Sequence, residues 1–249
     1  MSDTSPVLLQ TQNLSINFGG LKAVSDVTLA LREGIVTTLV GPNGAGKTTL
    51  FNLITGQLQP TQGDVLWQGK SIKNMPAWKI PHAGIGRTFQ DLKLFDEMTV
   101  LENVLAVTER QAWLWQPGGA KGARERREQA EHALEIVGLA EHRATRAMDL
   151  AYAERKFLSI ARILSAGSRL WLLDEPASGL DPSSYDRFLN VLRDQGANGI
   201  TICIIEHNLD IVKNISDRIA FLDQGCLLAE GDPQTILSDE RLADIYFGA

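Results

Sequence analysis

The chain has 249 residues and a mass of 27.3 kDa, with 24 Lys and Arg against 30 Asp and Glu, which gives a formal net charge of −6. This acidic balance argues against a nucleic-acid binder that relies on a basic surface to neutralise phosphates. With 44% hydrophobic and 22% charged residues, the composition is that of a folded chain, long enough for one large domain or two small ones.

Cysteine content and hydropathy bear on where the chain works. Cys203 and Cys226 are too few for a disulfide framework and are not spaced as a zinc site, so a reducing cytoplasm is predicted. The first residues have no basic start followed by an apolar stretch, and no apolar run approaches the roughly 18 to 20 residues that cross a bilayer. We expect that the chain does not span a membrane by itself.

The N-terminal part predicts paired antiparallel strands around the glycine pair at 19–20. Apolar residues alternate with polar neighbours on both sides of that pair: Leu14, Ile16 and Phe18 before it, and Val27, Leu29 and Leu31 after it. A short apolar run over 36–40 then stops at Gly41, and a stretch of helix length begins at Lys47 and ends at Gly56. The order strand, glycine loop, helix follows.

The middle of the chain predicts helices. Thr99 is followed by Glu102 and an apolar stretch, the pattern of a capping box, so a helix is expected from about Val100. The Gly- and Pro-rich segment 113–122 predicts a flexible connection into a charge-rich helix over 124–137. After Leu150, four apolar residues fall at helical spacing and should bury one face: Phe157, Ile160, Ala161 and Leu164.

The last third predicts α/β alternation, which favours a parallel sheet. The expected elements are strands over 170–173 and 200–205, helices near 185–192 and after His207, a hairpin turn at 223–225 and short closing helices. One domain over residues 7–249, with a helical subdomain inserted at about 91–165, is the economical organisation.

The strongest motif lies in the predicted glycine loop. The residues Gly41-Pro42-Asn43-Gly44-Ala45-Gly46-Lys47-Thr48, followed by Thr49, fit G-x-x-x-x-G-K-S/T between a strand and a helix. The glycines let successive N–H groups point inward, and the helix N-terminus adds its positive end to this anion nest. Lys47 then neutralises the β- and γ-phosphates of ATP, and the Thr48 hydroxyl is a predicted Mg²⁺ ligand.

A pair of carboxylates follows the predicted strand over 170–173. This places Asp174 and Glu175 at the carboxyl edge of the sheet, where phosphate loops also open. We expect Asp174 to hold Mg²⁺ through water. Glu175 is expected to orient or deprotonate the attacking water, because phosphoryl transfer depends on positioning and charge compensation.

With these motifs in order, the chain resembles the ATP-binding subunits of ABC transporters over nearly its whole length. The further matches are Phe18 for the aromatic residue stacked on adenine, Gln90 for the glutamine that joins the core to the helical region, Ser178-Gly179-Leu180-Asp181 for the dimer-contacting loop, and His207 for the switch histidine. The resemblance implies a P-loop NTPase with a RecA-like parallel sheet core, an N-terminal antiparallel β subdomain and an inserted α-helical subdomain. It also implies roles in catalysis and Mg²⁺ binding for Gln90, and contact between His207 and the γ-phosphate.

The resemblance implies a mechanism and partners. Two such subunits meet head to tail and sandwich two ATP molecules, each site using the phosphate loop of one chain and the signature loop of the other. Closure then requires that nucleotide binds the closed dimer more tightly than the open one. The region around Gln90 would receive a short cytoplasmic helix of a permease, which places the chain at the cytoplasmic face of a bacterial inner membrane.

The signature loop departs from the usual L-S-G-G-Q, because this chain has Leu150-Ala151-Tyr152-Ala153-Glu154. Ala151 lacks the hydroxyl donor, Ala153 adds a methyl group, and Glu154 brings a carboxylate near an anion. Two like charges about 4 Å apart at an effective dielectric of about 20 repel by about 4 kcal/mol, a penalty that shrinks if Glu154 points away. We predict a heterodimer in which the partner's site is weakened; the alternative is a subfamily that tolerates a loose signature.

Four segments are similar to the branched-chain or hydrophobic amino-acid importers: residues 17–24, 87–90, 150–152 and 245–248. Such importers imply a periplasmic solute-binding protein as a further partner. A urea or short-amide importer has a similar layout, and the permease contacts the solute, so the substrate is inferred by resemblance alone. Alternatives of other classes are a soluble ABC ATPase of DNA repair or translation, a regulatory subunit without useful hydrolysis, and the cassette of a lipid or drug exporter.

Overall fold

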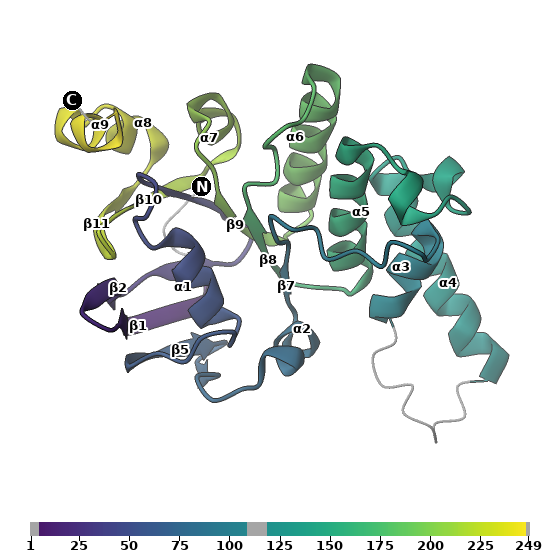
Figure 1. Cartoon of the computed structure of the whole chain (residues 1–249), viewed down its shortest axis with the longest axis horizontal. Helices are drawn as coiled ribbons and strands as arrows, with labels where there is room; N and C mark the ends of the chain where they lie inside the picture. The colour runs from purple at the N-terminus through teal and green to yellow at the C-terminus, as the bar shows by residue number, and fades with distance from the viewer. Residues whose placement is uncertain (1–4, 109–118, 248–249) are drawn as a thin grey trace.

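The computed structural model describes residues 5–108 and 119–247 (Figure 1). Two β-sheets and the helix α1 (Lys47–Ile54) lie in one half of the molecule, and helices α3 (Val100–Thr108), α4 (Gly119–Ile136) and α5 (Tyr152–Ser165) lie together in the other half. Across the described ranges, no helix combines the length and the apolar character needed to traverse a bilayer.

The first sheet is antiparallel, as predicted from the alternation on either side of the glycine pair. Its strands are β1 (Val7–Phe18), β2 (Leu21–Val27), β3 (Ala30–Arg32), β5 (Gln62–Trp67) and β6 (Lys70–Ser71). The order is β2-β1-β5-β6, and β3 pairs with β1. Strands β5 and β6 were not predicted, because this short hairpin carries few apolar residues.

The second sheet has the order β11-β10-β4-β9-β8-β7 and is parallel except for its terminal hairpin, which confirms the predicted sheet type. Its strands are β4 (Val36–Val40), β7 (Ile85–Arg87), β8 (Leu170–Asp174), β9 (Thr201–Ile205), β10 (Arg218–Asp223) and β11 (Cys226–Gly231). The predicted hairpin turn joins β10 to β11 through Gln224 and Gly225, both at positive φ. Carboxyl ends of β4 and β8 therefore open at the same edge, on either side of β9.

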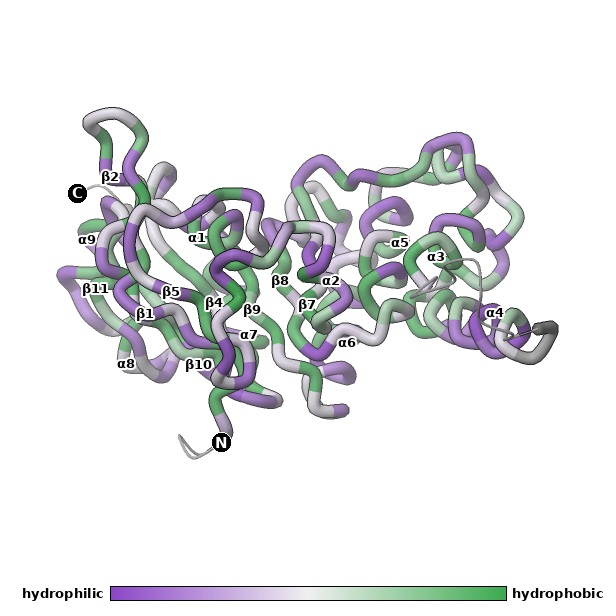
Figure 2. Tube along the Cα trace, turned by 90° about the horizontal axis from the view of Figure 1, so that it is seen from below, coloured by the Kyte–Doolittle hydropathy of each residue, from purple (hydrophilic) through white to green (hydrophobic). Residues whose placement is uncertain are grey.

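Strand β8 shows how the core is organised, because its side chains alternate between the two faces of the sheet. Leu170 and Leu172 pack with α1 and the antiparallel sheet, so α1 lies between the two sheets. Trp171 and Leu173 pack with the helices on the opposite face. Figure 2 shows the resulting pattern, with hydrophobic residues along the central strands and hydrophilic ones along α4.

The helical half confirms the capping box at the start of α3. Thr99 donates its main-chain N–H to Glu102 Oε2 at 2.8 Å, and the Glu102 N–H donates to Thr99 Oγ1 at 3.2 Å. The prediction of a connection over 113–122 is wrong for Gly119–Gly122, which form the first turn of α4; residues 113–118 lie outside the described residues. Glycine inside a helix costs only about 1 kcal/mol relative to alanine, so glycine content alone does not keep a segment out of a helix.

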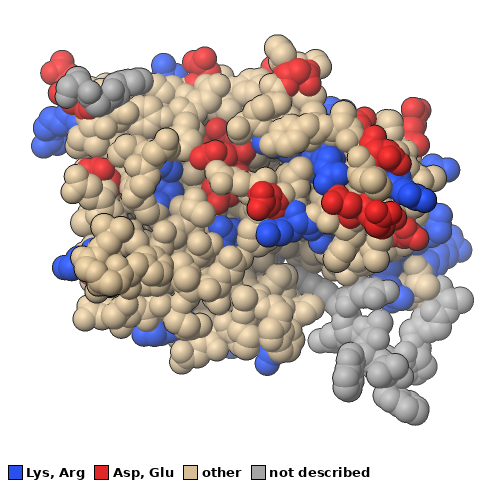
Figure 3. All heavy atoms as spheres, viewed as in Figure 1, with Lys and Arg blue, Asp and Glu red and all other residues tan. Residues whose placement is uncertain are grey.

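The remaining helices cover the parallel sheet and its edges. They are α2 (Ile80–Ala83), α6 (Pro182–Ala197), α7 (Leu209–Ile215), α8 (Pro233–Leu237) and α9 (Glu240–Phe247), with short 3-10 turns at Ala77–Lys79, Ala140–His142 and Ala147–Asp149. On the face drawn in Figure 3, acidic and basic side chains are interleaved over the helical half. The pairs Arg124–Glu128 and Arg127–Glu131 show this pattern along α4, where each pair is spaced by one helical turn.

Candidate active site

The phosphate loop is packed tightly between β4 and α1, and its glycines are required by that packing. Gly41 has φ 149°, and a Cβ atom there would lie 1.9 Å from the main-chain oxygen of Leu222 on β10. Gly46 has φ 97°, and a Cβ atom there would lie 2.4 Å from the main-chain oxygen of Ala23 on β2. Because both contacts are with backbone, they cannot relax cheaply, and the loop is held at the carboxyl end of β4.

Gly46 is also the N-cap of α1 and has no side chain to cap the first turn. The N–H groups of that turn have no intrahelical acceptors, so they and the positive end of the helix favour an anion at this position. The loop thus has the structure that the sequence motif predicts.

A cavity of about 870 Å³ opens over the loop. Its lining brings together predicted site residues from distant parts of the chain: Phe18, Asn43, Gly44, Ala45, Gly46, Lys47, Thr48, Thr49, Gln90, Glu175 and His207. Phe18 is 48% exposed at the end of β1, which leaves its ring available for stacking. Gly41, Pro42 and Asp174 are not among the lining residues but form hydrogen bonds with Lys47 or Thr48.

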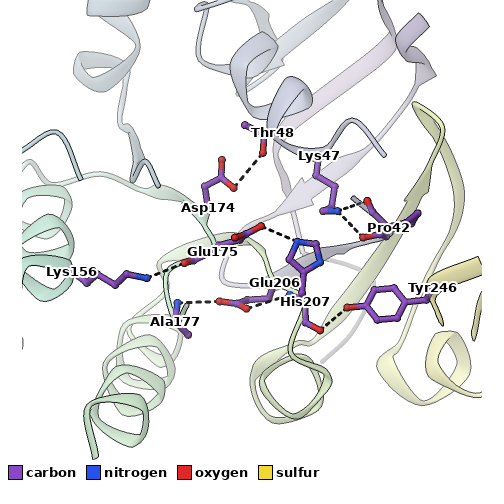
Figure 4. Close-up of polar contacts among 11 residues, drawn as sticks. Pro42, Lys47, Thr48, Lys156, Asp174, Glu175, Ala177, Glu206, His207 and Tyr246 are labelled. Atoms are coloured by element: carbon purple, nitrogen blue, oxygen red, sulfur yellow. Dashed lines mark hydrogen bonds and ion pairs between the residues drawn. The ribbon is translucent and has the colours of Figure 1, made fainter. Parts of the chain in front are cut away.

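Lys47 is buried, and its Nζ donates to the main-chain oxygens of Gly41 at 2.7 Å and Pro42 at 2.9 Å (Figure 4). Burial lowers the pKa of Lys47, while the charges of Glu175 and Asp174 oppose that shift. The ammonium group is therefore held at the loop by carbonyl acceptors and by two nearby carboxylates.

Asp174 ends β8 and faces Thr48 across the start of α1. Thr48 Oγ1 donates to Asp174 Oδ1 at 3.4 Å, and Arg87 Nη2 lies 3.4 Å from Asp174 Oδ2. Burial raises the pKa of Asp174, and Arg87 opposes the shift. This ion pair was not predicted, because Arg87 had been noted only as part of a subfamily motif; it forms because β7 pairs in parallel with β8.

Glu175 and His207 both line the cavity and form a hydrogen-bonded pair. Glu175 Oε1 lies 2.8 Å from His207 Nε2, and the Glu175 main chain is in the left-handed region at φ 46°. The Glu175 N–H donates to the main-chain oxygen of Ile205 at 3.0 Å, which ties the turn after β8 to the end of β9. Residues other than glycine rarely adopt this backbone conformation. Here it is fixed at the residue whose carboxylate is expected to act on water.

Two buried charged residues below this pair were missed by the sequence analysis. Glu206 accepts hydrogen bonds from the N–H groups of Ala177 at 3.1 Å and His207 at 3.3 Å, and burial raises its pKa. Lys156 on α5 donates to the main-chain oxygens of Glu175, at 3.2 Å, and of Ser178. Burial lowers the pKa of Lys156, although the charges of Glu206 and Glu175 oppose this. A sequence signal exists only for Glu206, which directly precedes the predicted histidine.

The signature segment is outside the cavity lining but contacts the predicted dimer loop. A Cβ atom at Gly179 would lie 3.1 Å from the Tyr152 ring, and Lys156 Nζ lies 5.2 Å from the centre of that ring. Asp181 caps α6 by accepting hydrogen bonds from the N–H groups of two serines in the first turn of that helix. The hydroxyl groups of these serines, together with their N–H groups, lower the pKa of Asp181.

The structure shows where the unusual Glu154 of the signature points. Its Oε2 accepts the Ala151 N–H at 2.8 Å, as in half of a capping box, and its Oε1 lies 3.3 Å from His142 Nε2. The carboxylate therefore has two polar partners within its own chain. Leu150 is buried at the start of this turn, while Ala151 and Tyr152 are exposed.

Comparison with known proteins agrees with this geometry. Residues 24–178, more than half of the chain, match the ABC transporter family. The chain is 39% identical over 249 residues to the high-affinity branched-chain amino acid transport ATP-binding protein BraF of Pseudomonas aeruginosa, covering 97% of this chain and 98% of that protein. It is 38% identical over 254 residues to LivG of Escherichia coli, a protein of the same description, covering 98% of this chain and 99% of that protein.

Solved structures show the same fold. The ADP conformation of MJ1267, an ATP-binding cassette of an ABC transporter, superimposes with a TM-score of 0.86 at 34% identity and covers 98% of this chain and 100% of that one. The structure of cbiO1 from Clostridium perfringens, part of the ABC transporter complex cbiONQ, matches with a TM-score of 0.80 at 27% identity and covers 95% of this chain and 92% of that one. The chain therefore belongs to the ABC transporter family and is an ATPase subunit of such a transporter. Both the predicted family and the predicted P-loop fold are confirmed.

Proposed function

We propose that the chain binds Mg·ATP in the cavity above the phosphate loop and hydrolyses it. The observation that carries this proposal is that one cavity joins the phosphate loop, Phe18, Gln90, Glu175 and His207. In this proposal residues 41–49 hold the triphosphate and Phe18 stacks on the adenine. Main-chain N–H groups and Lys47 then supply the charge compensation that phosphoryl transfer requires.

A magnesium ion fits the oxygen donors at the start of α1. The Thr48 hydroxyl and the Asp174 carboxylate already lie 3.4 Å apart, and hydroxyl and carboxylate oxygens suit this hard cation. We propose that Thr48, Asp174 and Gln90 hold Mg²⁺, directly or through water. When bound, the ion neutralises charge on the β- and γ-phosphates.

Glu175 is the proposed general base or water-orienting group, and His207 the proposed contact for the γ-phosphate. The 2.8 Å bond between their side chains restrains both in the same part of the cavity. A carboxylate that is already held in place can accept a hydrogen bond from the attacking water and orient it without first changing position. Such preorganisation lowers the barrier for phosphoryl transfer.

We propose that the chain works as a dimer with a second ATP-binding subunit, with its signature loop 150–154 and loop 178–181 serving the partner's nucleotide. Ala151 and Ala153 remove the serine hydroxyl and the glycine of the usual signature, so the partner's site is expected to be the weaker one. Placing Glu175→Gln, and its equivalent in the partner, separately into each subunit tests this. Unequal losses of ATPase activity support the asymmetric heterodimer, whereas equal losses support a subfamily that tolerates this signature.

The transport role is inferred from the relatives, which are named as branched-chain amino acid transport ATP-binding proteins. We propose that residues 7–249 form a single cassette with a helical subdomain at about 91–165. It would work at the cytoplasmic face of a bacterial inner membrane with permease subunits and a periplasmic solute-binding protein. A groove of about 340 Å³ next to Gln90, lined among others by Trp78, Phe89 and Arg162, is the proposed seat of the permease helix.

Solute uptake tests this proposal directly. In the source cells, loss of the chain should abolish uptake of labelled leucine, isoleucine and valine, and the wild-type chain should restore it while Glu175→Gln should not. Loss of urea or short-amide uptake alone would assign the chain to that importer class instead. Unchanged uptake of all these solutes would contradict an importer role for them.

A further inference from the structure

The switch histidine lies in a very short link between two elements. β9 ends at Ile205 and α7 begins at Leu209, so only Glu206, His207 and Asn208 connect them. Asn208 caps α7 through a side-chain bond to the N–H of Asp210 at 2.9 Å. The position of the His207 ring therefore depends on how the main chain of this link is held.

Both main-chain groups of His207 are held by side chains. Its N–H donates to Glu206 Oε2 at 3.3 Å, and its carbonyl oxygen accepts from the Tyr246 hydroxyl at 2.5 Å (Figure 4). The imidazole on the same residue meets Glu175 at 2.8 Å. Tyr246 belongs to α9, so this helix is bonded directly to the main chain of the residue that carries the imidazole ring.

Tyr246 is itself fixed by the packing of the last two helices. Its ring makes an edge-to-face contact with Phe221 on β10, with ring centres 6.4 Å apart. It also packs on a buried apolar cluster that joins α7, β4, β10, α8 and α9: Val40, Val212, Ile219, Phe221, Ile236 and Leu242. Burial raises the pKa of the Tyr246 hydroxyl, so it stays a donor at neutral pH.

We propose that Tyr246 is a positioning residue for hydrolysis: from α9 it holds the main chain at His207 so that the imidazole stays on Glu175. This inference rests on the role proposed above for His207. α9 thus fixes the switch segment from outside the phosphate site, and Tyr246 itself does not touch the reacting groups. A positioned imidazole matters because misplacement of a group near the reaction lowers turnover more than it lowers substrate binding.

The substitution Tyr246→Phe removes only the hydroxyl and keeps the ring on Phe221. ATP hydrolysis by the purified full-length chain, alone or with co-expressed partners, should show a kcat lowered by about three- to tenfold with KM for ATP unchanged. Ser238→Ala at the end of α8, which also removes a hydroxyl bonded to a main-chain oxygen, that of Thr235 at 3.1 Å, is the matched control and should leave kcat unchanged.

A double-mutant cycle separates positioning from general stability. Tyr246→Phe should have no further effect in a His207→Ala background, because the ring that Tyr246 positions is then absent. Losses that multiply, or a kcat for Tyr246→Phe equal to that of the wild type, would overturn the proposal. If His207→Ala alone leaves hydrolysis unchanged, the proposed role of His207 fails instead.

Amide hydrogen exchange on the isolated chain gives a second readout that needs no turnover. Peptides covering 206–212 should exchange faster in Tyr246→Phe than in the wild type, while peptides from α1 should not change. The same exchange rate over 206–212 in both proteins would also overturn the proposal.

Discussion

The ion pair between Arg87 and Asp174 joins the edge strand β7 to the carboxylate at the end of β8. The two side chains are 6% and 2% exposed, and the nitrogen and oxygen lie 3.4 Å apart. Arg87 also donates to Asn52 Oδ1 at 2.7 Å and Thr55 Oγ1 at 3.0 Å on α1 and its cap. The substitution Arg87→Met keeps the apolar stem but leaves Asp174 buried without its cation.

Breaking a buried pair by removing one partner costs about 3–5 kcal/mol, because an uncompensated charge remains. The 3.4 Å separation places this pair at the lower end, about 3 kcal/mol. For a chain of this size each kcal/mol lowers Tm by about 2–4 °C, so Arg87→Met should lower Tm by about 6–12 °C. Adding Asp174→Asn should restore about 1–2 kcal/mol, because neither charge is then left alone.

Urea unfolding of the wild type, both single variants and the double variant measures this coupling. A cost below about 1 kcal/mol for Arg87→Met, or costs of the two substitutions that simply add, would contradict the charge pairing. Arg87→Lys is a useful control, because it keeps a charge but cannot reach Asp174, Asn52 and Thr55 together.

The same pair predicts a pH dependence with a definite sign. Burial raises the pKa of Asp174, so the folded chain keeps this proton to a higher pH than the unfolded chain does. Stability from this group therefore falls as pH rises through the interval between the unfolded and folded pKa values. Removing Arg87 raises the folded pKa further, so the cost of Arg87→Met should be largest at neutral pH and shrink toward about pH 4; an equal cost at both would contradict it.

Three further substitutions test other contacts. Gly41→Ala places a Cβ atom 1.9 Å from a main-chain oxygen and should lower the free energy of unfolding in urea by about 1–3 kcal/mol. In the control Gly20→Ala the new Cβ atom meets nothing within 4 Å, so the free energy of unfolding should change by less than about 0.5 kcal/mol. Lys156→Met frees the main-chain oxygen of Glu175 and should lower kcat about tenfold without changing the Kd for ATP; an unchanged kcat would argue against it. Glu154→Ala removes the acceptor at the start of α5 and should cost about 0.5–1 kcal/mol, and an unchanged midpoint would show that this bond contributes nothing.

Local patterns were sufficient to predict the part of the site that is continuous in sequence. The apolar run of β4, the glycines and Lys47 form strand, loop and helix within twenty residues, and the apolar run of β8 leads directly to Asp174. Each of these signals arises from the periodicity or the backbone freedom of neighbouring residues, so tertiary contacts were not needed to see them.

The missed residues depend on long-range contacts. Arg87 lies in the three-residue strand β7, too short for periodicity to show, and it meets Asp174 only because β7 pairs with β8. Lys156 is buried, although lysine is rarely buried without a partner. Its ammonium group finds hydrogen-bond acceptors only when α5 packs beside the turn that contains Glu175. Tyr246 could be recognised as part of a terminal motif, but its bond to His207 spans 39 residues.

Calorimetric titration of the purified chain with ATP tests the central claim most directly. The wild type should bind ATP in a Mg²⁺-dependent manner, and Lys47→Ala should weaken binding by about tenfold to a hundredfold, because each charge-assisted bond to phosphate contributes about 1.5–3 kcal/mol. Lys70→Ala, on an exposed strand of the other sheet, should bind as the wild type does. Equal affinity in the wild type and Lys47→Ala would contradict the claim that residues 41–49 hold the triphosphate.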